Sequence, residues 1–270
     1  MKKNIAFLLV YLALNSTIKA DTAEGIKLYD LGKFSKAILE LSPEASNGDS
    51  TAQYYMSRIY YYGEGVNKDA ATALMWAELS ANANNPRGQR ALGSLYGAGA
   101  GITRDYAEAM KWYQLAADQG DAYAQRNIGS LFSSGRGVVQ DYTEALKWFR
   151  LAADQSDSDA QRDIGILYSS GYGVVQDYTE AMKWYRLAAD QGDAEAQLGI
   201  GILYESGNGV TQDFAKALKW YRLAADQGDA GAQGRLGTAY YFGDGFPQDY
   251  SEAVRWWQLA ADQGYTDSEE

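Results

Sequence analysis

The chain has 270 residues, of which 13% are aromatic, and a formal net charge of −11 at pH 7. So acidic a protein repels the phosphates of nucleic acids, which argues against binding to DNA or RNA. The sequence contains no cysteine and no histidine. We therefore expect no disulfide, no thiol nucleophile, no Ser-His-Asp triad and no ordinary zinc or haem site.

The first twenty residues have the pattern of a secretory signal peptide. Lys2 and Lys3 precede an apolar run over 5–14, and Ala20 provides a small residue for cleavage. The run is too short to span a bilayer, so removal is favoured over the alternative of an uncleaved membrane anchor. Cleavage after Ala20 leaves 21 basic and 35 acidic residues and a net charge of −14. We expect a periplasmic or secreted protein that has no membrane span once the signal is removed.

The rest of the sequence repeats with a period of 36 residues. The period is marked by Trp76, Trp112, Trp148, Trp184, Trp220 and Trp256. The six blocks are 49–84, 85–120, 121–156, 157–192, 193–228 and 229–264, preceded by a shortened unit at 21–48 and followed by an acidic tail at 265–270. A fixed period of this size predicts one all-α domain, an α/α superhelical solenoid in which each unit stacks on its neighbours.

Each block predicts two helices joined by a short loop. In the third block Asp121 is expected to cap the first helix, which ends at Gly135, and Gly137 permits a tight connection. Asp141 and Glu144 have the spacing of a capping box at the start of the second helix. The apolar stripes expected to be buried are Ala124, Ile128, Leu131 and Phe132 in the first helix, and Tyr142, Ala145, Trp148, Phe149 and Ala152 in the second.

The repeated pattern resembles a known family. Residues 160–192 read AQRDIGILYSSGYGVVQDYTEAMKWYRLAADQG, which is similar to the Sel-1-like repeat, a relative of the tetratricopeptide repeat. The resemblance covers 49–264 in six copies, whereas 21–48 lacks the Gly-x-Gly loop and resembles a plain tetratricopeptide unit that caps the end. The resemblance implies an α/α solenoid that acts as an adaptor or scaffold for other proteins. Bacterial relatives are often exported and serve envelope assembly, polysaccharide machinery or contact with host cells.

The blocks differ from one another mainly at their third, sixth, seventh, tenth, thirteenth and fourteenth positions. Helical spacing places these positions on one face of the first helix. The resemblance implies that this face lines the concave groove of the solenoid. The candidate partner-binding residues on it are Tyr54, Tyr55, Arg58, Tyr61, Tyr62, Arg87, Arg90, Tyr123, Arg126, Arg162, Arg235 and Tyr241.

Three of these arginines, Arg90, Arg126 and Arg162, occupy the same position in successive blocks. We predict that they form a ladder on the groove face that reads carboxylates or phosphates, because guanidinium groups bind these anions in a bidentate manner. The alternative is that each arginine pairs with an acid of the neighbouring block, such as Asp159 or Asp163, in a solvated ion pair that contributes little.

Other kinds of site are disfavoured. The segment from Gly135 to Gly137 follows no strand and precedes no Gly-Lys-Ser/Thr, so it matches no nucleotide fingerprint. Asp154, Asp157 and Asp159 lack the spacing of a calcium loop and are expected to cap helices. The tryptophans at helical spacing are expected to fill the core rather than to stack on sugars. We therefore predict no catalytic residue, no cofactor and no metal site.

These features predict an exported scaffold, not an enzyme, that binds a protein or peptide partner of acidic character through its groove. The first alternative is an envelope module that binds glycan or peptidoglycan through tyrosines stacked on sugar rings. A remote alternative is a β-lactam-related hydrolase, an activity linked to cysteine-rich relatives whose cysteines this chain lacks.

Overall fold

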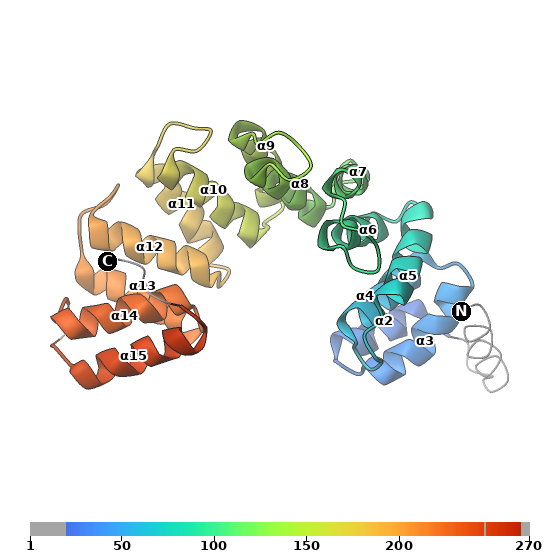
Figure 1. Cartoon of the computed structure of the whole chain (residues 1–270), viewed down its shortest axis with the longest axis horizontal. Coiled ribbons are helices and arrows are strands. Elements are labelled where there is room, and N and C mark those ends of the chain that lie inside the picture. The colour runs from blue at the N-terminus through green and yellow to red at the C-terminus, as the bar shows by residue number, and fades with distance from the viewer. Residues whose placement is uncertain (1–19, 246, 266–270) are drawn as a thin grey trace. The chain divides into compact units, whose positions relative to one another are not determined.

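The computed structural model describes residues 20–245 and 247–265, which fold into helices joined by short loops (Figure 1). The predicted signal peptide and acidic tail lie outside the described residues, apart from Ala20 and Tyr265. The described chain divides into two compact units, with the boundary between residues 140 and 141. No helix within the described ranges is long and apolar enough to cross a membrane.

The first unit holds the shortened N-terminal pair of helices and the first repeats. Its helices are α2 (Thr22–Asp30), α3 (Phe34–Ser46), α4 (Ser50–Tyr62), α5 (Ala70–Asn82), α6 (Pro86–Ala98), α7 (Tyr106–Ala117) and α8 (Ala122–Ser134). Within this unit each helix packs on its neighbours in sequence, and α4 also contacts α6. Tyr29 of α2 and Leu41 of α3 are buried in one cluster with Tyr55 and Met56 of α4. The pair α2–α3 therefore covers the side of α4 that would otherwise be exposed.

The second unit repeats the same arrangement. Its helices are α9 (Tyr142–Ala153), α10 (Ser158–Ser170), α11 (Tyr178–Ala189), α12 (Ala194–Ser206), α13 (Phe214–Asp226), α14 (Ala230–Phe242) and α15 (Tyr250–Asp262). The predicted all-α solenoid of helix-turn-helix repeats is confirmed, with α4, α6, α8, α10, α12 and α14 as the first helices of the six repeats.

The helix ends are set by the predicted residues. The Asp121 carboxylate accepts the Ala124 N–H at 2.8 Å, and Gly135 ends α8 in the left-handed conformation with φ of 67°. The capping box forms only in part. In the equivalent pair of the fourth repeat, the Asp177 carboxylate accepts the Glu180 N–H, but the Asp177 N–H donates to the Tyr168 carbonyl at 3.0 Å, and Glu180 instead pairs with Lys183. The Tyr168 carbonyl, in the preceding helix, therefore accepts the N–H that a glutamate side chain accepts in a complete capping box.

The tryptophans are less buried than predicted. Trp76 and Trp256 are buried, whereas Trp112, Trp148, Trp184 and Trp220 are half-buried. The residue that follows the tryptophan is the buried aromatic in four repeats, as Tyr113, Phe149, Tyr185 and Tyr221. Adjacent residues on a helix point about 100° apart, so only one of each pair can face the helix partner directly. The prediction that each tryptophan is buried between adjacent helices is therefore wrong for the second to fifth repeats, where the neighbouring ring takes the central position.

Candidate functional site

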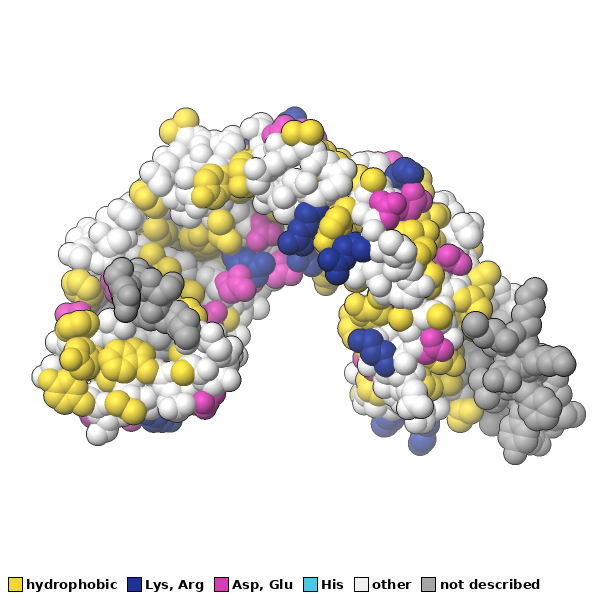
Figure 2. Space-filling view, viewed as in Figure 1, with side chains coloured by type: hydrophobic (Ala, Val, Ile, Leu, Met, Phe, Trp, Pro, Cys, Tyr) yellow, Lys and Arg dark blue, Asp and Glu magenta, His cyan; other side chains and the backbone are white. Residues whose placement is uncertain are grey.

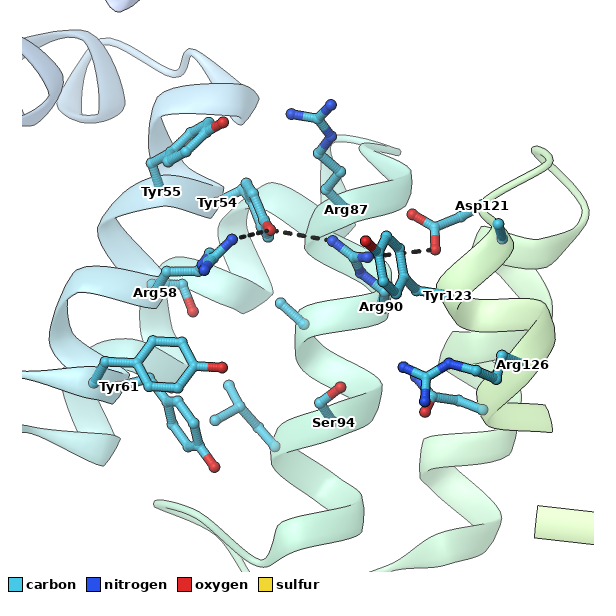
Figure 3. Close-up of a pocket in the computed structure, with 16 residues that line it drawn as sticks. Tyr54, Tyr55, Arg58, Tyr61, Arg87, Arg90, Ser94, Asp121, Tyr123 and Arg126 are labelled. Atoms are coloured by element: carbon cyan, nitrogen blue, oxygen red, sulfur yellow. Dashed lines mark hydrogen bonds and ion pairs between the residues drawn. The ribbon is translucent and has the colours of Figure 1, made fainter. Parts of the chain in front are cut away.

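A cavity of about 790 Å³ opens on the first unit between the first helices of three successive repeats (Figure 3). Side chains of α4, α6 and α8 line it, and the space-filling view shows basic side chains gathered where α6 and α8 meet (Figure 2). Nine of the predicted partner-binding residues lie on its walls, namely Tyr54, Tyr55, Arg58, Tyr61, Tyr62, Arg87, Arg90, Tyr123 and Arg126. The structure thus brings together on one surface most of the candidate partner-binding residues, which vary between the blocks.

Two arginines from different helices meet at one phenol. Arg58 Nη1 and Arg90 Nη2 both donate to the Tyr54 hydroxyl, at 3.3 and 3.1 Å. Tyr54 is itself buried and packs edge-on against Tyr55 with the ring centroids 5.2 Å apart. A neutral hydroxyl therefore holds the two guanidinium groups side by side without cancelling their charge.

The arginines of the pocket also contact aromatic rings. The Arg58 guanidinium carbon lies 5.3 Å from the centre of the Tyr29 ring and 5.7 Å from that of Tyr62. Arg90 lies 4.7 Å from the centre of the Tyr123 ring, and Arg126 lies 5.9 Å from it. Cation–π contacts orient a guanidinium without adding a negative charge.

The lining contains one acidic residue, Asp121, beside four arginines. Asp121 caps α8, and its Oδ1 is 3.8 Å from Arg90 Nη1, which is beyond hydrogen-bond distance. The carboxylate therefore offsets only part of the positive charge of Arg58 and Arg90, in a protein of net charge −11.

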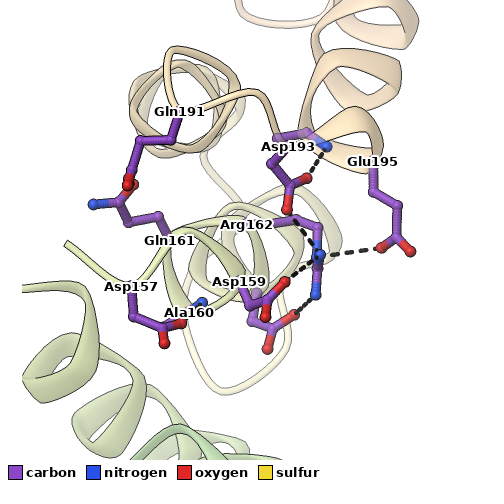
Figure 4. A network of polar contacts seen from close by, with 10 residues as sticks. Asp157, Asp159, Ala160, Gln161, Arg162, Gln191, Asp193 and Glu195 are labelled. Carbon is purple, nitrogen blue, oxygen red and sulfur yellow. Dashed lines mark hydrogen bonds and ion pairs between the residues drawn. The ribbon is translucent and has the colours of Figure 1, made fainter. Parts of the chain in front are cut away.

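Arg162 has a different environment, in the second unit (Figure 4). Its guanidinium is 2.9 Å from Asp159 and from Asp193, 3.2 Å from Glu195 and 3.4 Å from Asp163. Burial lowers the pKa of Arg162, but the four carboxylates outweigh burial and the net effect is a raised pKa. For Arg162 the structure therefore favours the alternative, which is pairing with neighbouring acids, over the binding of a carboxylate or phosphate ligand.

The two remaining candidates also lie in the second unit and do not line the pocket. Arg235 Nη1 is 3.2 Å from Glu205 Oε2, which also accepts the Tyr221 hydroxyl at 2.7 Å. Tyr241 packs in an aromatic cluster, with its ring centre 5.0 Å from that of Phe242 and 5.5 Å from that of Trp257. Both side chains therefore have structural contacts of their own.

Three residues at the floor of the pocket, Ser57, Ala91 and Leu95, were not among the predicted site residues. They are small or apolar and carry no recognisable chemistry, so side-chain type alone does not reveal them. A usable signal exists at Ser57, because the later blocks all have glycine at that position. Among the described residues no group of three His, Cys, Asp or Glu side chains is placed to hold a metal ion.

Comparison with known proteins identifies the class to which the fold and its repeats belong. The Sel1 repeat family model matches residues 50–85, 86–121, 122–157, 158–193, 194–229 and 230–265, one residue later than the predicted blocks. The chain therefore belongs to the Sel1 repeat family, whose members are generally non-catalytic scaffolds for protein interactions.

Solved structures give the same result. A Sel1 repeat protein from Oxalobacter formigenes is 36% identical with a TM-score of 0.84, and the match covers 90% of this chain and 100% of that one. A protective antigen of uropathogenic Escherichia coli strains with the same repeat fold is 37% identical with a TM-score of 0.74 over 83% of this chain, and the match spans 48% of that protein's length. An immunity protein of Pseudomonas aeruginosa, Pa5087, shares the fold at 19% identity and a TM-score of 0.55, over 79% of this chain and 81% of its own. The search of curated proteins finds no match.

Proposed function

We propose that this protein is an exported scaffold that binds a carboxylate-bearing segment of a partner protein in the pocket between α4, α6 and α8. The observation that carries the proposal is the pair Arg58 and Arg90, held together by a neutral phenol in an acidic protein. Guanidinium groups bind carboxylates through charge-assisted, bidentate hydrogen bonds. A partner carboxylate that reaches both arginines supplies the negative charge that Asp121 alone does not provide.

The mechanism is the presentation of preorganised side chains. The arginines already contact Tyr29, Tyr54, Tyr62 and Tyr123, so binding immobilises few rotatable bonds in the receptor. A receptor whose groups are already positioned loses less conformational entropy when its partner binds.

The same contacts weaken the case for a glycan ligand. Tyr62 and Tyr123 are the most exposed pocket tyrosines, but arginines lie over both rings. A sugar that stacked on those ring faces would first have to displace a guanidinium.

The pocket is tested by reversing its charge. Arg58→Glu with Arg90→Glu should abolish capture of partner proteins from an envelope extract, measured by quantitative mass spectrometry, with helical circular dichroism unchanged. The matched control is Lys147→Glu with Lys183→Glu, which changes the net charge equally at two exposed lysines of the second unit. Arg87→Glu serves as a further variant because Arg87 is exposed at the rim and its replacement leaves the core intact.

Two results would contradict the proposed site. One is that the Arg58/Arg90 variant captures the same proteins as the unmodified chain. The other is that the unmodified chain sediments with purified cell-wall sacculi and captures no protein, which would favour the glycan alternative.

Export rests on the signal-peptide pattern at the start of the sequence. We expect the protein recovered from the periplasm or the medium of its source to begin at Asp21, as determined by amino-terminal sequencing and intact mass. Recovery with Met1 in place would show that the leader is not removed.

A further inference from the structure

The second helix of each repeat carries an aromatic residue directly after the tryptophan, except in the first repeat. The later repeats have Tyr113, Phe149, Tyr185, Tyr221 and Trp257, whereas the first has Ala77. The first helix differs in a matching way. The glycines 93, 129, 165, 201 and 237 of the later repeats correspond to Ser57 in the first.

The fourth repeat shows what this pair of residues does. A Cβ atom on Gly165 of α10 would lie 2.6 Å from the Tyr185 ring, and one on Gly199 of α12 would lie 3.0 Å from the other edge of that ring. The Tyr185 hydroxyl is hydrogen-bonded to Ser169 at 3.1 Å. The ring thus fills the space between two successive first helices, and glycine provides the room for it.

In the first repeat the positions that flank this space are Ser57 of α4 and Ala91 of α6, and both line the pocket. Ser57 donates its hydroxyl to the Ala73 carbonyl at 2.8 Å. The residue that follows the tryptophan of this repeat is Ala77, which has no ring. Leu95, which is buried, adds an apolar wall. Tyr61 stands at the position of Ser169 and packs against the buried cluster that contains Ala77 and Leu95. The floor of the pocket is therefore the place where the other repeats insert their own aromatic side chain.

We propose that this floor accepts an aromatic side chain of the partner, which takes the position of the missing ring while a neighbouring carboxylate of the partner binds Arg58 and Arg90. The inference rests on the proposed function. It adds that the pocket prefers a short peptide in which an acidic residue adjoins an aromatic one. Ala91 and Leu95 supply apolar surface for the ring, and the two arginines on the adjoining wall supply donors for the carboxylate. Aromatic anchors buried in a pocket commonly carry a large share of the binding energy of an interface.

The test uses three synthetic peptides with the full chain, by isothermal titration calorimetry. The probes are acetyl-Asp-Phe-Asp-amide, acetyl-Asp-Ala-Asp-amide and acetyl-Lys-Phe-Lys-amide. We expect the first to bind at least about tenfold more tightly than the second, because removal of a buried aromatic ring loses most of its transfer free energy. The third should not bind.

The decisive variant is Ser57→Gly with Ala77→Tyr. It restores the pair found in later repeats, so it is compatible with the fold, and it fills the floor from within. We expect it to lose the preference for Asp-Phe-Asp over Asp-Ala-Asp while it keeps the affinity for Asp-Ala-Asp. The matched control makes the reverse exchange in the second unit, Gly165→Ser with Tyr185→Ala, and should leave the binding of all three peptides unchanged.

The outcomes separate this inference from the proposed function. Equal affinity for the Phe and Ala peptides, or an unchanged preference in the Ser57→Gly/Ala77→Tyr variant, overturns the aromatic floor and leaves the acid-binding pocket standing. Failure of both acidic peptides to bind, together with partner capture that is insensitive to Arg58→Glu/Arg90→Glu, overturns the proposed function. If the unmodified chain binds chito-oligosaccharides and the Ser57→Gly/Ala77→Tyr variant does not, the floor binds a sugar and the proposal of a peptide ligand is overturned.

Discussion

At the scale of single residues, a buried glutamine marks the difference between the first repeat and the others. The first helix of a later repeat buries a glutamine whose carbonyl accepts a second glutamine from the end of the following helix. The bonds are Gln119 to Gln89 at 2.8 Å, and Gln191 to Gln161, Gln227 to Gln197 and Gln263 to Gln233 at 2.9 Å. In the first repeat the donor position is Ala83, and the side-chain oxygen of Gln53 is buried with no hydrogen-bond partner among the described residues.

Ala83→Gln should therefore stabilise the protein. The new amide supplies the donor that Gln53 lacks, and a satisfied buried hydrogen bond contributes about 1 kcal/mol to the free energy of unfolding. Urea denaturation measures the change, with Ala83→Met as a control of similar length that cannot donate. If the two variants are equally stable, the glutamine at position 83 does not donate a hydrogen bond to the Gln53 side-chain oxygen.

The unequal burial of adjacent aromatics gives a second prediction at this scale. Phe149 is buried whereas Trp148 is half-buried. Phe149→Ala should lower the free energy of unfolding by about 3–5 kcal/mol, because it removes buried surface and leaves a cavity. Trp148→Ala should cost less, since solvent already reaches part of the indole. Chemical denaturation of the two variants checks the order, and a larger loss for Trp148→Ala would restore the tryptophan to the centre of the core.

At the scale of secondary-structure elements, the caps define where the helices begin. Twelve of the fourteen described helices start after an aspartate, and the others after Lys33 and Asn85. At α5 the Asp69 carboxylate accepts the Thr72 hydroxyl at 2.7 Å and two backbone N–H groups. Hydrogen bonds from the side chain and backbone of Thr72 lower the pKa of Asp69. These bonds favour the charged form, so the cap depends on ionisation.

This shift predicts a loss of stability in acid. A carboxyl whose folded pKa is lowered contributes its full stabilisation above the unfolded pKa, about 3.9, and loses it as the pH falls through the folded pKa. Asp69→Asn keeps an acceptor oxygen but does not titrate, so its unfolding free energy should fall less steeply than that of the unmodified chain between about pH 5 and pH 3. Urea denaturation at several pH values measures both slopes. Identical slopes would mean that the Asp69 cap does not depend on charge.

At the scale of the whole molecule, the arginines of the pocket lie in a chain of net negative charge. The chain carries a net charge of −11, whereas four arginines and one aspartate line the pocket. An acidic partner is therefore repelled by the protein at long range and attracted by the pocket at short range. Screening acts on both effects within a Debye length of about 10 Å at 0.1 M salt.

The rim arginine should control how binding responds to salt. Affinity for acetyl-Asp-Phe-Asp-amide should decrease between about 50 and 500 mM NaCl, because the ion pairs at the pocket are partly exposed and are screened. Arg87→Glu should flatten this decrease, since it removes a cation at the mouth and adds an anion. Calorimetric titrations at the two salt concentrations test both statements. A salt dependence that is the same in the variant would place the peptide away from Arg87.

Much of the molecule was predictable because it depends on local, repeated interactions. The period, the aspartate caps and the left-handed glycine at Gly135 follow from backbone hydrogen bonding within a few residues. The face that carries Tyr54, Arg58 and Arg90 follows from helical spacing and from variation between copies of one motif.

What only the tertiary structure decided depends on residues about thirty positions apart. Arg90 and Arg162 hold equivalent positions, and the equivalent caps Asp121 and Asp193 lie 3.8 and 2.9 Å from them. Arg162 also pairs with Glu195 of the next repeat, whereas Arg90 meets the Tyr123 ring at that position. An arginine is free to bind a ligand only where packing leaves its charge uncompensated. The pocket floor has the same origin, because Ser57 and Ala91 lie on different helices and only packing brings both to the pocket.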